Sequence, residues 1–186
     1  MTTRDSFTYM YGKLRVRAKI PVKGGSWPAI WLLGNWWEWP YNGEIDVMEY
    51  YRGMILANAC WGGTVRWQGV WDSAAPSNTH FTDQDPDRVD KFPVWELDWN
   101  YDRMIISVDG EELNTIELNK TVNGTLYVDG NKLEGSGENP FRKTYDGFGH
   151  YLLVNLALGG NNGGTIDNSA FPMTYLIDYV RVYQEE

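Results

Sequence analysis

The sequence predicts an all-β protein, folded as an antiparallel sandwich, and three observations favour this class. Short apolar or alternating runs recur between clusters of Gly, Pro, Asn and Asp, as is typical of strands joined by turns. No segment keeps a 3.6-residue apolar period long enough to form a helix that connects parallel strands. Asp109-Gly110 separates two apolar runs and is the strongest hairpin signal in the chain. Strands joined in this way pair antiparallel and stack as two sheets.

Alternation of residue types defines the strands in order along the chain. The first run, KLRVRAKI over 13–20, places four apolar side chains on one face, namely Leu14, Val16, Ala18 and Ile20. Further strands, about nine in all, are expected at 27–33, 44–51, 54–61, 92–100, 104–108, 113–118, 151–158 and 173–183. Residues 122–149 read mostly as loop, and a loop of that length is typical of the wall of a binding groove.

The chain of 186 residues suits a single domain over 1–186, since it contains no linker, repeat or low-complexity stretch. Its net charge of −9 argues against nucleic acid or an anionic membrane as partner. One cysteine, Cys60, excludes a disulfide framework within the chain, and two histidines, His80 and His150, argue against a multi-histidine metal centre. No apolar run approaches the roughly 18 residues of a membrane span.

Aromatic residues are unusually frequent, with ten Trp, twelve Tyr and six Phe. A buried indole needs a partner for its N–H group, so cores favour Leu, Ile and Val over Trp. Ten tryptophans therefore indicate a surface on which flat rings stack, and the C–H faces of sugars are the leading candidates. The alternative for each single Trp is a place in the core.

The most informative stretch is GEIDVMEY over 43–50. Glu44 and Asp46 share one face of a strand, and a β-bulge at Val47-Met48 would bring Glu49 onto that face as well. Three carboxylates on one strand repel each other, which argues for a chemical role. Two of them could act as the pair that cleaves a glycosidic bond with retention, for which the carboxyl groups stand about 5–5.5 Å apart. A solvated acidic edge and a Ca²⁺ site are the alternatives.

This stretch resembles the active-site strand of the family 16 glycoside hydrolases, in the longer E-x-D-x-x-E form of laminarinase-like members. Nearly the whole chain carries further similarity, in FTYMYGKLRVRAKIP, GGSWPAIWLLG, WELDWNYDRMIISVDG, HYLLVNLALGG and YLIDYVRVY. The resemblance implies a β-jelly-roll sandwich of the concanavalin A-like lectin and glucanase type, whose concave sheet carries an aromatic-lined cleft.

Catalytic roles follow from the resemblance position by position. Glu44 resembles the nucleophile, Glu49 the acid/base, and Asp46 the carboxyl group that assists the nucleophile. They imply a retaining endo-glycosidase that hydrolyses β-1,3- or β-1,3-1,4-glucan, with a marine galactan as another substrate. A non-catalytic, lectin-like sandwich that binds carbohydrate is the alternative function, and it would not need two close carboxylates.

The sugar subsites implied by the resemblance involve four further residues, Arg17, Trp31, Asn58 and Asn155. Each has a structural alternative: Arg17 pairing with a surface acid, Trp31 in the core, and the two asparagines bonding buried backbone. Cys60 stands where many laminarinase-like members have a His.

Family domains usually carry several dozen residues before the segment that TTRDSFTYMYG resembles. We therefore expect missing N-terminal strands and, near the N-terminus, a sheet edge that is exposed or covered in a dimer. The reaction needs no cofactor, but many relatives hold a structural Ca²⁺, for which Asp178 is the matching ligand. A polysaccharide substrate implies a secreted or periplasmic protein, either monomeric or an edge-mediated dimer, although the N-terminus lacks the apolar region of a signal peptide.

Overall fold

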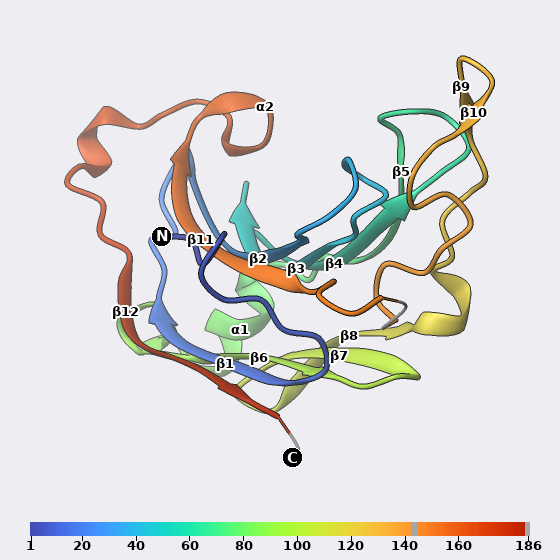
Figure 1. The fold of residues 1–186 in the computed structure, drawn as a ribbon. Helices are drawn as coiled ribbons and strands as arrows, with labels where there is room; N and C mark the ends of the chain where they lie inside the picture. Colours follow the sequence, from blue (N-terminus) through green and yellow to red (C-terminus); the bar gives the residue numbers. More distant parts are fainter. Residues whose placement is uncertain (143–144, 185–186) are drawn as a thin grey trace.

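The computed structural model describes residues 1–142 and 145–184, and it has two stacked antiparallel sheets (Figure 1). The first sheet has the strand order β11-β2-β3-β4-β5 and the second the order β12-β1-β6-β7-β8. Their bounds are β1 Gly12–Lys19, β2 Ser26–Gly34, β3 Glu44–Tyr51, β4 Met54–Gly62, β5 Gly69–Ala74, β6 Val94–Trp99, β7 Arg103–Val108, β8 Glu111–Glu117, β11 His150–Leu158 and β12 Leu176–Tyr183. The predicted sandwich is confirmed.

Smaller elements connect the strands. They are helices α1 Asn78–Gln84 and α2 Gly160–Gly163, the pair β9 Tyr127–Val128 and β10 Asn131–Lys132, and 3₁₀ turns at Arg88–Asp90, Leu118–Lys120 and Asn168–Ala170. None of the described helices has the length and hydropathy that crossing a bilayer requires. All nine predicted strands are present, whereas β5 and α1 have no counterpart in the predicted set.

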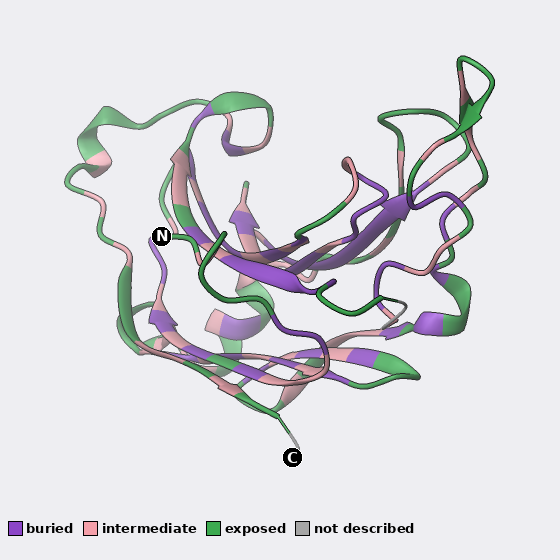
Figure 2. Cartoon of the chain, in the orientation of Figure 1, coloured by how far each residue is buried: buried purple, intermediate pink, exposed green. Residues whose placement is uncertain are grey.

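The core lies between the two sheets and follows the predicted alternation. Leu14, Val16 and Ala18 of β1 are fully buried, and Arg15 and Arg17 point outward from the same strand. The chain turns from β7 into β8 at Asp109-Gly110, where both residues have positive φ, as the hairpin signal predicted. Buried residues gather in the two sheets, and α2 and the β9–β10 pair are largely exposed (Figure 2).

The two sheets differ in how their edges are covered. The segment 1–9 runs along β11, with the amide of Thr3 donating to the carbonyl of Leu152 and the amide of Tyr9 to that of His150. Within the described residues β12 pairs with β1 alone, so its outer side is an open edge, formed by the C-terminal strand.

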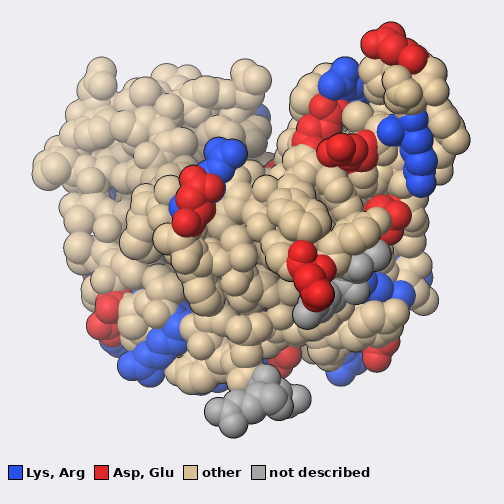
Figure 3. Space-filling model, viewed as in Figure 1, with Lys and Arg blue, Asp and Glu red and all other residues tan. Residues whose placement is uncertain are grey.

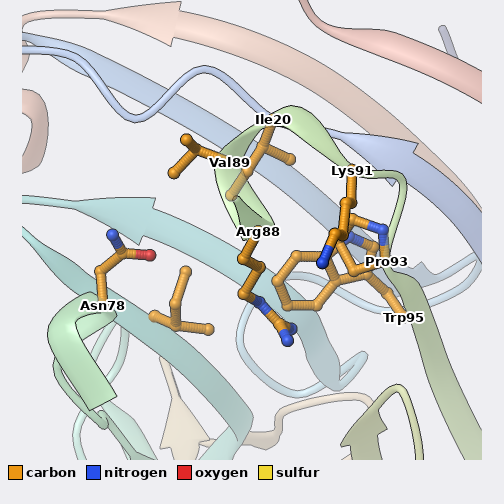
Figure 4. A pocket seen from close by; sticks show the side chains of 8 residues that line it. Ile20, Asn78, Arg88, Val89, Lys91, Pro93 and Trp95 are labelled. Carbon is orange, nitrogen blue, oxygen red and sulfur yellow. The ribbon is translucent and has the colours of Figure 1, made fainter. Parts of the chain in front are cut away.

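A small cavity of about 20 Å³ lies between α1, the 3₁₀ turn at Arg88–Asp90 and β6 (Figure 4). Its size suits one water molecule. Arg88 lines it, and the Nη2 atom of that residue is buried without a hydrogen-bond partner in the described part of the chain. The side chain stacks on Phe81, with 4.6 Å from Cζ to the ring centroid, so this cavity is part of the packing of α1.

Candidate active site

Three carboxyl groups of β3 face one cleft because the strand contains a bulge. Asp46 pairs with Asn58 and Glu49 with Leu56, so the two residues between them have no partners on β4. Those two residues, Val47 and Met48, are both fully buried in the core. The extra residue restores the phase of Glu49, and the predicted bulge is confirmed.

The cleft lies on the free face of the first sheet and has a volume of about 450 Å³. In Figure 1 this face is the upper one, between α2 at one end and β5 with the β9–β10 pair at the other. The lining comes from β2, β3, β11 and the loop before β3, and consists of Trp27, Ala29, Trp31, Leu33, Trp39, Glu44, Asp46, Glu49, Asn155 and Ala157. Charged side chains gather on the β9–β10 extension, whereas the α2 end is largely uncharged in this view (Figure 3).

Asp46 is the most deeply buried of the three carboxyl groups, with 1% of its surface exposed. Burial raises its pKa well above the usual value, and the negative charges of Glu49 and Glu44 raise it further. A hydrogen bond with Glu44 also raises the pKa of Asp46 and lowers that of Glu44. The hydrogen bond between the two groups therefore favours the proton on Asp46 over Glu44.

Glu44 accepts a second hydrogen bond from an indole. Trp39 Nε1 lies 2.6 Å from Glu44 Oε2. Burial raises the pKa of Glu44, the hydrogen bonds from Trp39 and Asp46 lower it, and the charge of Glu49 raises it. The hydrogen bonds from Trp39 and Asp46 hold this side chain in place and act in favour of its carboxylate form.

Glu49 has a matching indole on the other side of Asp46. Trp27 Nε1 lies 2.8 Å from Glu49 Oε1, and Asn58 Nδ2 lies 3.4 Å from Oε2 and 3.2 Å from Asp46 Oδ2. Burial raises the pKa of Glu49, and the hydrogen bond from Trp27 lowers it. A carboxyl group with a raised pKa can hold a proton near neutrality, which suits a general acid.

Three of the four predicted subsite residues lie on the cleft face. Trp31 Nε1 donates to Asn155 Oδ1 at 2.7 Å, which ties β2 to the edge strand β11. Asn58 is buried between Asp46 and Glu49. Cys60 on β4 pairs with Glu44 on the neighbouring strand β3, and burial raises the pKa of the Cys60 thiol.

The prediction for Arg17 is wrong. This residue lies on β1, in the second sheet, and it points outward because Val16 and Ala18 occupy the inward positions. Its guanidinium bonds Asp178 on β12 and stacks over Phe92 at 5.4 Å. The alternative, in which Arg17 pairs with a surface acid, is therefore correct. Arg17 lies in the other sheet from the three carboxyl groups of β3.

Asp178 also has a different environment from the one expected of a calcium ligand. Its carboxylate bonds the Arg17 guanidinium, and both side chains are over 40% exposed. No three His, Cys, Asp or Glu side chains gather into a possible ion site within 1–142 and 145–184. These residues do not fit a bound Ca²⁺.

Sequence reasoning did not identify the hydrogen bonds that Trp27 and Trp39 donate to Glu49 and Glu44. Trp27 shares strand parity with Trp31, and that signal was available. Trp39 belongs to the WWEWP loop, whose path is set by tertiary contacts, including the bidentate pair of Arg66 with Glu38 at 2.8 Å.

Fold and site together define a β-sandwich with paired carboxyl groups on an aromatic-lined concave sheet. The model of the glycosyl hydrolases family 16 matches residues 1–136, and the chain belongs to this family. It is 32% identical over 193 residues to glucan endo-1,3-beta-glucosidase A1 of Niallia circulans, covering 100% of this chain and 26% of that protein. It is 33% identical over 176 residues to the beta-1,3-glucan-binding protein of Penaeus monodon, covering 88% of this chain and 46% of that protein.

Solved structures agree with this family. The structure of SCLam, a non-specific endo-beta-1,3(4)-glucanase, superposes with a TM-score of 0.73 at 30% identity and covers 100% of this chain and 62% of that one. The chain thus spans about a quarter to a half of the two curated relatives that it matches.

Proposed function

We propose that the protein is a retaining endo-glycosidase that hydrolyses β-1,3- or β-1,3-1,4-linked glucan. The observation that carries this proposal is the pair Glu44 and Glu49, which face one cleft with Asp46 between them and each accept a hydrogen bond from an indole. Relatives described as glucanases support glucan as the substrate class.

In the first step Glu44 attacks the anomeric carbon while Glu49 gives its proton to the glycosidic oxygen. The C–O bond breaks and a glycosyl ester of Glu44 forms. Glu49 Oε1 is engaged by Trp27 at 2.8 Å, whereas Asn58 approaches Oε2 only at 3.4 Å, so the proton is held on Oε2. In the second step Glu49 takes a proton from water, whose oxygen attacks the anomeric carbon and releases Glu44.

Asp46 serves Glu44 in both steps. In its protonated form it donates a hydrogen bond to Glu44, which keeps the nucleophile ionised and oriented. When the ester forms, Glu44 loses its charge while Glu49 becomes ionised, so the cluster holds one negative charge before and after the step.

The alternative function, glycan binding without hydrolysis, is suggested by the Penaeus monodon relative. Binding alone gives no reason to bury three mutually repelling carboxyl groups on one strand, since each raises the free energy of the folded state when ionised. The intact triad Glu44, Asp46 and Glu49 therefore favours the enzyme.

Incubation with laminarin, mixed-linkage β-glucan, agarose and carrageenan, followed by measurement of reducing ends, tests the proposal. We expect release from the first two, and loss of at least a thousandfold in kcat for Glu44→Gln and Glu49→Gln with oligosaccharide binding retained. Binding without any release of reducing ends by the unaltered protein would support the lectin instead.

We propose a secreted or periplasmic location, because polysaccharide substrates lie outside cells. The open side of β12 makes an edge-mediated dimer the alternative to a monomer. Sedimentation of the purified protein distinguishes the two.

A further inference from the structure

The cleft described above lies on one side of β3, over β2 and β11, and the free face of the sheet continues on the other side over β4 and β5. The pairing of residues between neighbouring strands identifies the side chains of β4 and β5 that belong to this face. Glu44 pairs with Cys60 and Cys60 with Trp71. Directly paired residues project from the same face, so Trp71 projects from the face that holds the three carboxyl groups.

Trp71 is exposed on this face, with 46% of its surface accessible. Its indole lies beside Gly69, two residues earlier on the same strand. A Cβ atom at Gly69 would stand 2.3 Å from Cys60 Sγ and 3.2 Å from Trp71 Nε1. The space that a side chain at 69 would fill is therefore occupied by the ring of Trp71 and the thiol of Cys60.

Side-chain hydrogen bonds from other elements hold β5, the strand that contains Trp71, in place. Asn114 on β8 of the second sheet donates from Nδ2 to the Ala57 carbonyl at 3.0 Å and to Asp72 Oδ1 at 3.2 Å. Arg66, in the turn before β5, bonds Glu38 in the loop that carries Trp39. The position of Trp71 is thus fixed relative to β4 and to the indole that contacts Glu44.

Trp71 stands two strands from Glu44, which corresponds to about 10 Å across the sheet. In a glycan that crosses the strands over the carboxyl groups, a sugar one or two units away from the cleaved bond lies at this distance from Glu44. An indole exposed on a rigid strand offers a flat apolar surface, which the C–H face of a pyranose ring covers well.

We propose that Trp71 is a sugar-stacking platform for the arm of the glycan that extends over β4 and β5. This inference rests on the proposed function and assigns that enzyme a second arm of its binding cleft, opposite the arm lined by Trp31 and Asn155. Long substrates engage Trp71, and substrates too short to reach past β4 do not.

The test compares Trp71→Ala with Val70→Ala on laminari-oligosaccharides of increasing length. Val70 is the matched control, because it is the adjacent residue on the same edge strand, is 43% exposed and points to the opposite face. We expect Trp71→Ala to lower kcat/KM about tenfold on long substrates, as loss of one aromatic contact implies, and to leave the shortest cleaved substrate unchanged. Val70→Ala is expected to match the unaltered protein at every length.

A binding measurement supplies the second readout. In a Glu44→Gln background, calorimetry should show about tenfold weaker binding of a long oligosaccharide when Trp71→Ala is added. If the unaltered protein cleaves glucan but Trp71→Ala and Val70→Ala behave alike at all lengths, the platform is refuted and the proposed function stands. If the unaltered protein cleaves no glucan, the proposed function fails and the platform falls with it.

Discussion

At the residue scale, the proposed chemistry depends on where protons reside among the three carboxyl groups of β3. The proposed function assigns them to Asp46 and Glu49 and leaves Glu44 ionised, because burial and like charges raise the pKa of Asp46 most strongly while hydrogen bonds from Trp39 and Asp46 lower that of Glu44. Sequence reasoning found all three acids from spacing alone. It could not find the donors that assign the protons, since the direction of an indole N–H depends on the surrounding fold.

Replacing each indole should move a different limb of the pH profile of kcat/KM. Trp39→Phe removes a hydrogen bond that lowers the pKa of Glu44, so the acid limb should move to higher pH. Trp27→Phe removes the corresponding bond to Glu49, so the alkaline limb should move to higher pH. Each variant should also lose about ten- to a hundredfold in rate, since a hydrogen bond to a charged group contributes about 1.5–3 kcal/mol.

Profiles of the two variants on laminarin, compared with Trp36→Phe in the same loop as control, check this assignment. Movement of the same limb in both variants, or of neither, would contradict the roles given to Glu44 and Glu49.

At the scale of secondary-structure elements, the bulge in β3 determines whether the three acids face the same cleft. Alternation predicted this bulge, because the three acids could share a face only with one extra residue in the strand. The pairing of β3 with β4 confirms it. Alternation also predicted the inward face of β1 correctly. The family resemblance placed Arg17 wrongly in a sugar subsite, because the sheet in which β1 lies follows from pairing with β6 and β12, which are distant in sequence.

Two deletions in β3 test the phase argument. Without Met48 the strand reads Glu-x-Asp-x-Glu, which keeps all three acids on one face without a bulge. Without Ile45 the first two acids become neighbours and point to opposite faces. Both residues are fully buried, so each deletion should cost roughly 2–5 kcal/mol of stability.

Hydrolysis of laminarin should be measurable for the Met48 deletion and absent for the Ile45 deletion, at a temperature where circular dichroism finds both folded. Equal activity in the two folded variants, or activity only without Ile45, would refute the role of strand phase.

At the scale of the whole molecule, the buried side of β11 links stability to pH. His150, at the start of this strand, is fully buried, and its ring lies 5.1 Å from that of Trp99 and 5.8 Å from that of Phe141 between centroids. Burial lowers its pKa from 6.5 to about 3. The sequence marked His150 only as one of two histidines, since its aromatic surroundings come from three separate parts of the chain.

Acid should therefore destabilise the fold through His150. Between pH 6.5 and 3 the unfolded chain binds a proton at this residue and the folded chain does not, so the free energy of unfolding falls as the pH falls, by about 1.4 kcal/mol per unit within that window. Urea unfolding across this range should show a shallower fall for His150→Gln than for the unaltered protein. His80→Gln is the control, because His80 is exposed, and an unchanged slope in His150→Gln would contradict the prediction.

The central claim is that Glu44 attacks the anomeric carbon and Glu49 exchanges the proton. The most direct test is the configuration of the azide product that each alanine variant forms from an aryl β-glycoside of a laminari-oligosaccharide. In Glu44→Ala, azide fills the space of the lost carboxylate, displaces the aryl group and should give the α-glycosyl azide. In Glu49→Ala, azide intercepts the ester on Glu44 and should give the β-glycosyl azide. The reverse pairing of variant and product, or hydrolysis by both variants at the unaltered rate, would contradict the account.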